Sequence, residues 1–192
     1  TPTAKEVLTG MNEALNDFAN PSGLYDSALH AKQLLENYRK KSALFLQCNS
    51  DEVVFTSGST ESNNIAILGG VAKFKTGRVI SIATEHASVY EPLMQLKKQG
   101  FEVKFAKVDK FGQIDINHLA SLLTKDTRLV TLSYANGEYG TIQPVIKIGQ
   151  LIKAFNASRN SGILFHTDAT AAALVLSCDV SRLGVDLLSL GG

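Results

Sequence analysis

Small hydroxyl residues gather in the segment Thr56–Asn64, which reads Thr-Ser-Gly-Ser-Thr-Glu-Ser-Asn-Asn. Ser59 and Thr60 stand where a helix is predicted to begin, and free backbone N–H groups together with the helix dipole favour an anion there. The pattern therefore indicates a phosphate site, although either hydroxyl could instead cap the helix. Because the segment has neither the Gly-x-Gly-x-x-Gly of dinucleotide-binding folds nor a Gly-Lys-Ser/Thr ending, a generic nucleotide-binding domain is disfavoured.

A carboxylate, Asp168, lies in His166-Thr167-Asp168-Ala169-Thr170, directly after an apolar run. A carboxylate in this position can accept a hydrogen bond from a protonated ring nitrogen and keep that nitrogen protonated. In a pyridoxal cofactor this ion pair preserves the ring as an electron sink. The alternative is that Asp168 only caps the next segment.

Two further polar segments follow apolar runs. In Thr84-Glu85-His86-Ala87-Ser88, the imidazole of His86 could stack on a flat cofactor or transfer a proton, or it could be a packing residue. In Tyr134–Gly140, Asn136 and two glycines indicate a turn as much as a site.

The apolar runs that precede these segments predict the elements that position them. Strands are expected at Val53–Thr56, Val79–Ile82, Val103–Ala106, Leu129–Ser133, Ile163–His166 and Leu187–Leu190, and helices at about Thr60–Phe74, Ser88–Gln99, Ile116–Leu123 and Val145–Asn156. Apolar strands that alternate with helices predict an α/β fold with a mostly parallel sheet covered by helices on both faces. Ligands of such sheets bind at the carboxyl ends of the strands, where the four polar segments fall.

The chain of 192 residues is expected to form one undivided domain, with N-terminal helices at about residues 3–47. Its nineteen basic and eighteen acidic residues give no net field that would attract nucleic acid or a membrane, so a cytoplasmic location is expected. Cys48 and Cys178 are too few for a disulfide framework and too isolated for a zinc cluster. We therefore expect free thiols and no metal.

Together these segments resemble successive motifs of the cysteine desulfurases, within the class V aminotransferase group. The resemblance rests on Phe55–Asn64, Thr84–Pro92, Ala135–Pro144, Phe165–Ala169 and Gly184–Leu190, and it extends over nearly the whole chain. It implies the large domain of a type I pyridoxal-phosphate-dependent transferase, incomplete at its C-terminus.

The resemblance also implies the roles of individual residues. Ser59 and Thr60 would bind the phosphate of pyridoxal 5'-phosphate, His86 would lie over its ring as a catalytic residue, Asn136 would lie beside the ring, and Asp168 would bind the ring nitrogen. Enzymes of this kind convert L-cysteine to L-alanine and leave a persulfide on an enzyme cysteine. The implied partners are a sulfur-acceptor or iron–sulfur scaffold protein and a second copy of the chain in a homodimer.

The sequence departs from the family pattern in several places. It ends at Gly191-Gly192, before the His-Lys pair whose lysine forms the Schiff base, so we expect the chain alone to be inactive. Neither Cys48 nor Cys178 occupies the position of the persulfide cysteine. Polar residues of the family pattern are replaced by Gly137, Ala171 and Tyr25.

Two other functions stay open at this point. The protein could be another class V aminotransferase or a selenocysteine lyase, or it could be a non-catalytic cofactor-binding or scaffold half that pairs with a separate chain. The all-apolar strand Leu187–Leu190 is also expected to lie inside the sheet, because a strand covered on both faces needs such a pattern.

Overall fold

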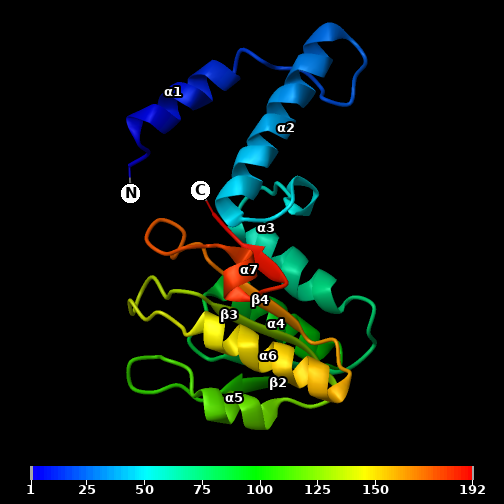
Figure 1. The fold of residues 1–192 in the computed structure, drawn as a ribbon, viewed down its shortest axis with the longest axis vertical. Helices are drawn as coiled ribbons and strands as arrows, with labels where there is room; N and C mark the ends of the chain where they lie inside the picture. Colours follow the sequence, from blue (N-terminus) through cyan, green and yellow to red (C-terminus); the bar gives the residue numbers. More distant parts are fainter. Residues whose placement is uncertain (1, 192) are drawn as a thin grey trace. The chain divides into compact units, whose positions relative to one another are not determined.

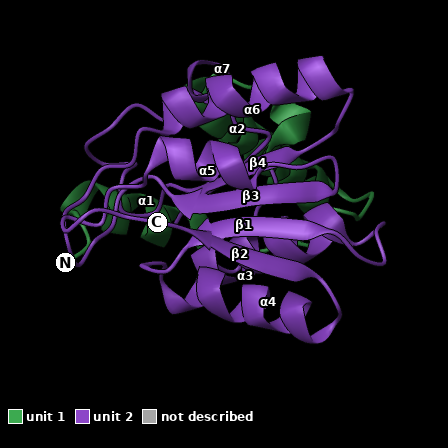
Figure 2. Cartoon of the chain, turned by 90° about the horizontal axis from the view of Figure 1, so that it is seen from below, with its two compact units in different colours: residues 1–53 green, residues 54–192 purple. Residues whose placement is uncertain are grey.

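The computed structural model describes residues 2–191, and the chain forms two compact units, residues 1–53 and residues 54–192 (Figure 2). The expectation of one partial cofactor-binding domain stays a prediction.

Residues 1–53 are mainly helical. They contain α1 (Lys5–Ala14), α2 (Asp26–Leu46) and the short 3₁₀-helix η1 (Ser50–Glu52). The helix α2 ends at Gln47, whose φ of 55° is left-handed and stops the helical hydrogen-bond pattern. None of the residues of α1 is buried, so this helix makes no contribution to a core within its own unit.

Residues 54–192 are built on a five-stranded parallel sheet in the order β2-β1-β3-β4-β5. The strands are β1 (Arg78–Ile82), β2 (Glu102–Ala106), β3 (Thr127–Ser133), β4 (Leu164–Asp168) and β5 (Leu187–Ser189). The helices of this unit are α3 (Ser59–Asn64), the π-helix η2 (Ile65–Gly69), α4 (Ala87–Lys98), α5 (Ile116–Leu122), α6 (Val145–Arg159) and α7 (Val180–Leu183). The predicted parallel α/β sheet is thus confirmed (Figure 1).

Two apolar clusters show that both faces of this sheet are covered. On one face, Leu119 of α5, Ile148 of α6 and Leu183 of α7 pack against β-strand residues such as Phe165. On the other face, Ile67 of η2 and Leu93 of α4 pack against residues such as Leu129. Figure 2 shows these two helical layers with the strands between them. Burial on both faces explains the largely apolar runs of β1 and β3, whereas the edge strand β2 alternates and is mostly half-exposed.

The helix predicted at Thr60–Phe74 differs from the observed one. It begins as α3, continues through the wider turns of η2, and is lost at Ala72. Gly69 and Gly70 lie at this change, and glycine is a poor helix former because it loses the most backbone freedom on folding. The sequence therefore indicated the helix but not its irregular second half.

Two strand predictions are wrong. Val53–Thr56 is not a strand, and within residues 2–191 it has no partner strand; Val54 and Phe55 are 71% and 47% exposed. The strand β5 lies at the edge of the sheet and pairs with β4, not inside the sheet as expected for Leu187–Leu190. For Leu187–Leu190 the apolar pattern gave the strand itself, but it carried no information about hydrogen-bonded pairing along both edges of that strand.

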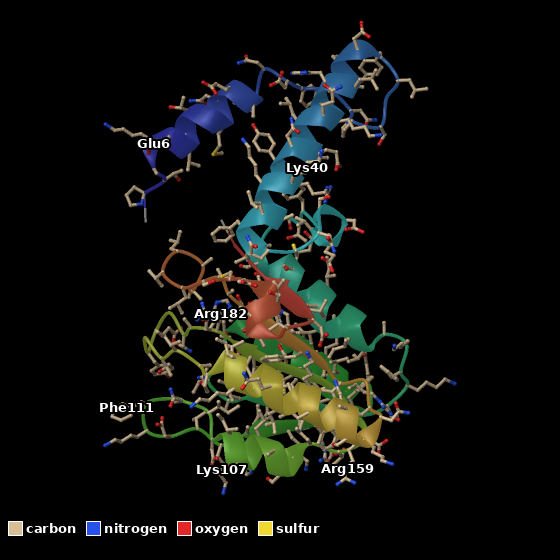
Figure 3. All side chains as sticks on the ribbon, in the orientation of Figure 1. Glu6, Lys40, Lys107, Phe111, Arg159 and Arg182 are labelled. Atoms are coloured by element: carbon tan, nitrogen blue, oxygen red, sulfur yellow. The ribbon has the colours of Figure 1, made fainter. Side chains whose placement is uncertain are left out.

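Within residues 2–191 no helix has the length and apolar character needed to cross a membrane. Charged side chains such as Arg159 and Arg182 lie on the outside of residues 54–192 (Figure 3).

Candidate functional site

A cavity of about 290 Å³ lies at the carboxyl ends of the strands, within residues 54–192. Four segments supply its walls: the start of α3, the loop after β1, the loop after β3, and the end of β4 with the residues that follow it. The lining residues are Ser59, Thr84, Glu85, His86, Ser88, Ser133, Ala135, Asn136, Gly137, Glu138, Asp168, Thr170 and Ala171. This is the edge where parallel α/β sheets bind ligands.

Four of the five site residues predicted from the sequence line this cavity, namely Ser59, His86, Asn136 and Asp168. Thr60 does not; it lines an adjoining hollow of about 550 Å³, which shares His86 and Ser88 with the cavity. The structure therefore brings residues from four different segments of the sequence together and places Thr60 beside them.

The carboxylate of Asp168 is held in a fixed orientation. The residue is 7% exposed and ends β4. Its Oδ2 accepts a hydrogen bond of 2.7 Å from Asn63 Nδ2, and its Oδ1 accepts one of 2.9 Å from the backbone N–H of Thr170. Hydrogen bonds to a carboxylate are stronger than those between neutral groups, so this side chain is well ordered before any ligand arrives.

The imidazole of His86 is held by its Nδ1 atom. His86 is the N-cap residue of α4, and Nδ1 accepts a hydrogen bond from Ser88 N at 3.1 Å, while Ser88 Oγ lies 2.8 Å from the same atom. A backbone N–H is always a donor, so Nδ1 must be unprotonated and the neutral ring carries its proton on Nε2. His86 therefore both caps α4 and lines the cavity.

Asn136 organises its loop as well as lining the cavity. Its Oδ1 accepts hydrogen bonds from the backbone N–H groups of Glu138 and Tyr139, each 2.9 Å long, and its Nδ2 donates to Thr84 O at 2.8 Å. The turn interpretation is thus confirmed. One N–H of the amide is left over from these contacts for a ligand.

Glu85 is a cavity residue to which the sequence assigned no role. Glu85 is half-buried in the cavity wall, and its carboxylate oxygens accept hydrogen bonds from Ser133 N and Ser133 Oγ. The pKa of this carboxyl is raised to about 7, chiefly by burial and to a smaller extent by the nearby charge of Asp168, while the two hydrogen bonds from Ser133 oppose the increase. Its place between His86 and the strand β1 was the only signal in the sequence.

Asn63 and Ser88 were also missed. Asn63 is fully buried and Ser88 is 9% exposed, and a 2.9 Å hydrogen bond joins Asn63 Nδ2 to Ser88 Oγ. Asn63 does belong to the hydroxyl-rich segment after Thr56, yet nothing local indicates a partner 105 residues away. The sequence did not show that Asn63 is buried, and this is why its role was not predicted.

Two departures from the family pattern lie next to each other in the cavity wall. A Cβ atom at Gly137 would lie 3.8 Å from the Cβ atom of Ala171, and both residues line the cavity. These residues contribute no polar side chain to the wall. The polar side chains next to this position in the cavity wall are those of Asn136, Glu138 and Thr170.

The residues present fit a pyridoxal-phosphate cofactor. Hydroxyl groups at the start of α3 suit a phosphate, the ordered carboxylate of Asp168 suits a protonated ring nitrogen, and His86 offers a flat ring in the same cavity. The cavity volume is close to the lower end of the range for small-molecule sites. Neither cysteine lines this cavity, and burial raises the pKa of the Cys178 thiol, which disfavours the reactive thiolate.

Comparison with known proteins agrees with this geometry. A family model described as "Aminotransferase class-V" matches residues 1–192. The chain is 38% identical to "Cysteine desulfurase IscS" of Dictyoglomus turgidum, covering 99% of this chain and 48% of the relative. It is 39% identical to "Cysteine desulfurase IscS" of Methanosarcina thermophila, covering 100% of this chain and 47% of the relative.

Solved structures agree as well. "SspA in complex with cysteine" matches with a TM-score of 0.91 at 35% identity, over 100% of this chain and 55% of that one. "NIFS-LIKE PROTEIN" matches with a TM-score of 0.91 at 30% identity, over 100% of this chain and 52% of that one. The chain thus spans about half the length of the curated relatives it matches.

Proposed function

Because the chain belongs to the aminotransferase class-V family, we propose that its protein is a pyridoxal-phosphate-dependent cysteine desulfurase that uses the cavity at the sheet edge. The observation that carries the proposal is the convergence of Ser59, His86 and Asp168 on one cavity. The relatives named cysteine desulfurases favour this activity over the other reactions open to the family.

Each cavity residue has a defined task in this proposal. Ser59 and the neighbouring Thr60 would donate hydrogen bonds to the cofactor phosphate. Asp168, whose carboxylate is held in place by Asn63 and Thr170, would accept a hydrogen bond from the protonated ring nitrogen. His86 would offer its ring to the cofactor and its Nε2 for proton exchange, since Nδ1 is occupied by Ser88.

When bound, pyridoxal phosphate supplies an electron sink for negative charge that develops at the α-carbon of an amino acid. In the proposed reaction the carbon–sulfur bond of L-cysteine breaks. The sulfur passes to a thiol, which becomes a persulfide, and the carbon skeleton leaves as L-alanine. Within this reaction His86 is the residue of the described chain best placed to hold or move a proton beside the substrate.

The partners follow from the same proposal. A sulfur-acceptor or iron–sulfur scaffold protein would receive the persulfide sulfur, and a second copy of the chain would complete a homodimer. Both stay proposals.

The test is alanine and sulfide formation from L-cysteine by the full-length gene product, supplied with pyridoxal phosphate and a thiol reductant. We expect a rate far above that of free pyridoxal phosphate. The 192-residue chain is the comparison, and we expect it to be inactive, because within residues 2–191 no lysine lines the cavity. Activity on selenocysteine alone would favour a lyase, transamination would favour an aminotransferase, and no reaction with bound cofactor would favour a scaffold role.

A further inference from the structure

Asn63 lies in the protein interior between the two residues that flank the proposed cofactor. It belongs to α3, has no exposed surface, and hydrogen-bonds with residues 25 and 105 positions away in the chain. We infer that Asn63 is a positioning residue that couples the Asp168 carboxylate to the His86 imidazole through Ser88. The functional meaning of this coupling rests on the proposed function, but its geometry does not.

The chemistry of Asp168 fixes the orientation of the Asn63 amide. Asn63 Nδ2 lies 2.7 Å from Asp168 Oδ2 and 2.9 Å from Ser88 Oγ. An ionised carboxylate only accepts hydrogen bonds, so the amide atom beside it must be the NH₂ group. Both N–H groups are then used, one on each neighbour. The opposite atom, Asn63 Oδ1, is buried without a hydrogen-bond partner within residues 2–191, so the amide is held from its donor side alone.

The orientation of Asn63 in turn fixes the hydroxyl of Ser88. Since Ser88 Oγ accepts a hydrogen bond from Asn63, its own hydrogen is free to point to His86 Nδ1, which is 2.8 Å away. The backbone N–H of Ser88 donates to the same nitrogen at 3.1 Å. Two donors therefore converge on Nδ1, and only one of them depends on Asn63.

Burial makes this chain of hydrogen bonds costly to break. Asn63, Ser88 and Asp168 are 0%, 9% and 7% exposed, so water cannot easily replace a lost partner. These hydrogen bonds also connect α3, the start of α4 and the end of β4. Asn63 thus ties together three elements that carry cavity residues, although it does not line the cavity itself.

The direct test is the protonation state of the His86 ring, read from nitrogen-15 NMR of the histidine side chains in the cofactor-free protein at slightly alkaline pH. The His86→Gln variant assigns the signals. In the parent we expect the proton on Nε2 and an unprotonated Nδ1. Ser88→Ala removes one of the two donors to Nδ1, and Asn63→Ala removes the contact that orients the Ser88 hydroxyl toward Nδ1. In both variants we therefore expect the two nitrogen signals to move toward each other.

Asn64→Ala is the matched control, since the side chain of the neighbouring Asn64 donates to Thr60 O within its own helix and, within residues 2–191, takes no part in the link from Asp168 to His86. It should leave the His86 signals unchanged. If Asn63→Ala does not fold, Ser88→Ala tests the same link. A parent with the proton on Nδ1, or Asn63→Ala and Ser88→Ala spectra identical to that of Asn64→Ala, would overturn the inference.

A second measurement separates this inference from the proposed function. Pyridoxal phosphate should bind Asn63→Ala about tenfold more weakly than the parent, because the carboxylate of Asp168 has lost a charge-assisted bond. If the parent does not bind the cofactor, the proposed function fails while the NMR result still decides the coupling. If the parent binds and Asn63→Ala binds equally well with unchanged His86 signals, the coupling is wrong and the function stands.

Discussion

Both carboxylate oxygens of Glu85 accept hydrogen bonds from Ser133, Oε1 from the backbone N–H at 2.9 Å and Oε2 from the hydroxyl at 2.6 Å. Glu85 follows β1 and Ser133 ends β3, so this double contact joins the carboxyl ends of two neighbouring strands. The contact lies in the wall of the cavity, where the charge of Asp168 is also close.

Glu85 makes the stability of the chain depend on pH. Burial raises the pKa of its carboxyl from 4.5 to about 7, so between these values the folded state binds more protons than the unfolded state. Its contribution to stability is full below pH 4.5 and is lost as the pH rises through about 7. The whole loss amounts to about 3 kcal/mol, of which about 1 kcal/mol falls between pH 6.5 and pH 8.5. Urea unfolding of the parent at pH 6.5 and pH 8.5 should show a lower free energy at the higher pH.

The Glu85→Gln variant is the matched change, because it keeps the shape and removes the titration. We expect its free energy of unfolding to be nearly constant between pH 6.5 and pH 8.5. A variant that loses stability over this interval as much as the parent does would show that another group is responsible.

His166 has the opposite effect on the acid side. This fully buried residue of β4 lies 2.7 Å from Thr131 Oγ1 through Nδ1 and 3.0 Å from Ser189 Oγ through Nε2. Burial lowers the pKa of its imidazole to about 4, although the charge of Asp168 opposes this change. Its contribution to stability is therefore full above pH 6.5 and is lost as the pH falls through about 4.

The acid-dependent loss of stability caused by His166 is best measured in the Glu85→Gln background. In the parent, protonation of Glu85 stabilises the folded state over part of the same pH interval and would mask that loss. There we expect a loss of about 3 kcal/mol between pH 6.5 and pH 4. The additional substitution His166→Gln should lower stability at neutral pH and remove a large part of this acid-dependent loss. An equally steep loss in that double variant would contradict the assignment to His166.

Gly149 allows α6 to approach the end of α7. A Cβ atom at this position would lie 2.6 Å from Leu183 O and 2.9 Å from Gly184 O, and both are backbone atoms that cannot move independently. Gly149→Ala should therefore destabilise the chain by about 1–3 kcal/mol in thermal or urea unfolding. Gly69→Ala is the control, because nothing lies within 4 Å of its Cβ position. Alanine there should be neutral or slightly stabilising, and equal effects of the two changes would contradict the packing argument.

The sequence predicted those parts of the fold in which burial leaves a local pattern. The strands β1, β3 and β4 contain buried apolar residues because helices cover both faces, and their positions followed from that pattern. The edge strand β2 was found from its alternating Val103 and Phe105. The same reasoning wrongly predicted a strand at Val53–Thr56. An apolar run has the same sequence pattern whether it pairs with other strands or lies outside the sheet. Strand pairing depends on distant segments and leaves no local pattern.

The candidate site was predictable to a similar extent. Ser59, His86 and Asp168 could be found because each follows a predicted strand and has a side chain suited to a cofactor. Asn63 and Ser88 could not, since their importance comes from contacts with each other and with Asp168 across the fold. The shared edge of a parallel sheet is implied by the strand pattern, but the side chains buried beneath it are not.

The most direct test of the account is a titration of the 192-residue chain with pyridoxal phosphate, followed by absorbance and by calorimetry. We expect saturable binding that Asp168→Ala and Thr60→Ala each weaken about tenfold or more, since each removes a charge-assisted hydrogen bond. Asp126→Ala is the control, because the Asp126 side chain is 84% exposed and does not line the cavity; it should bind like the parent. If Asp168→Ala and Thr60→Ala also bind like the parent, the cavity at the carboxyl ends of the strands is not the cofactor site.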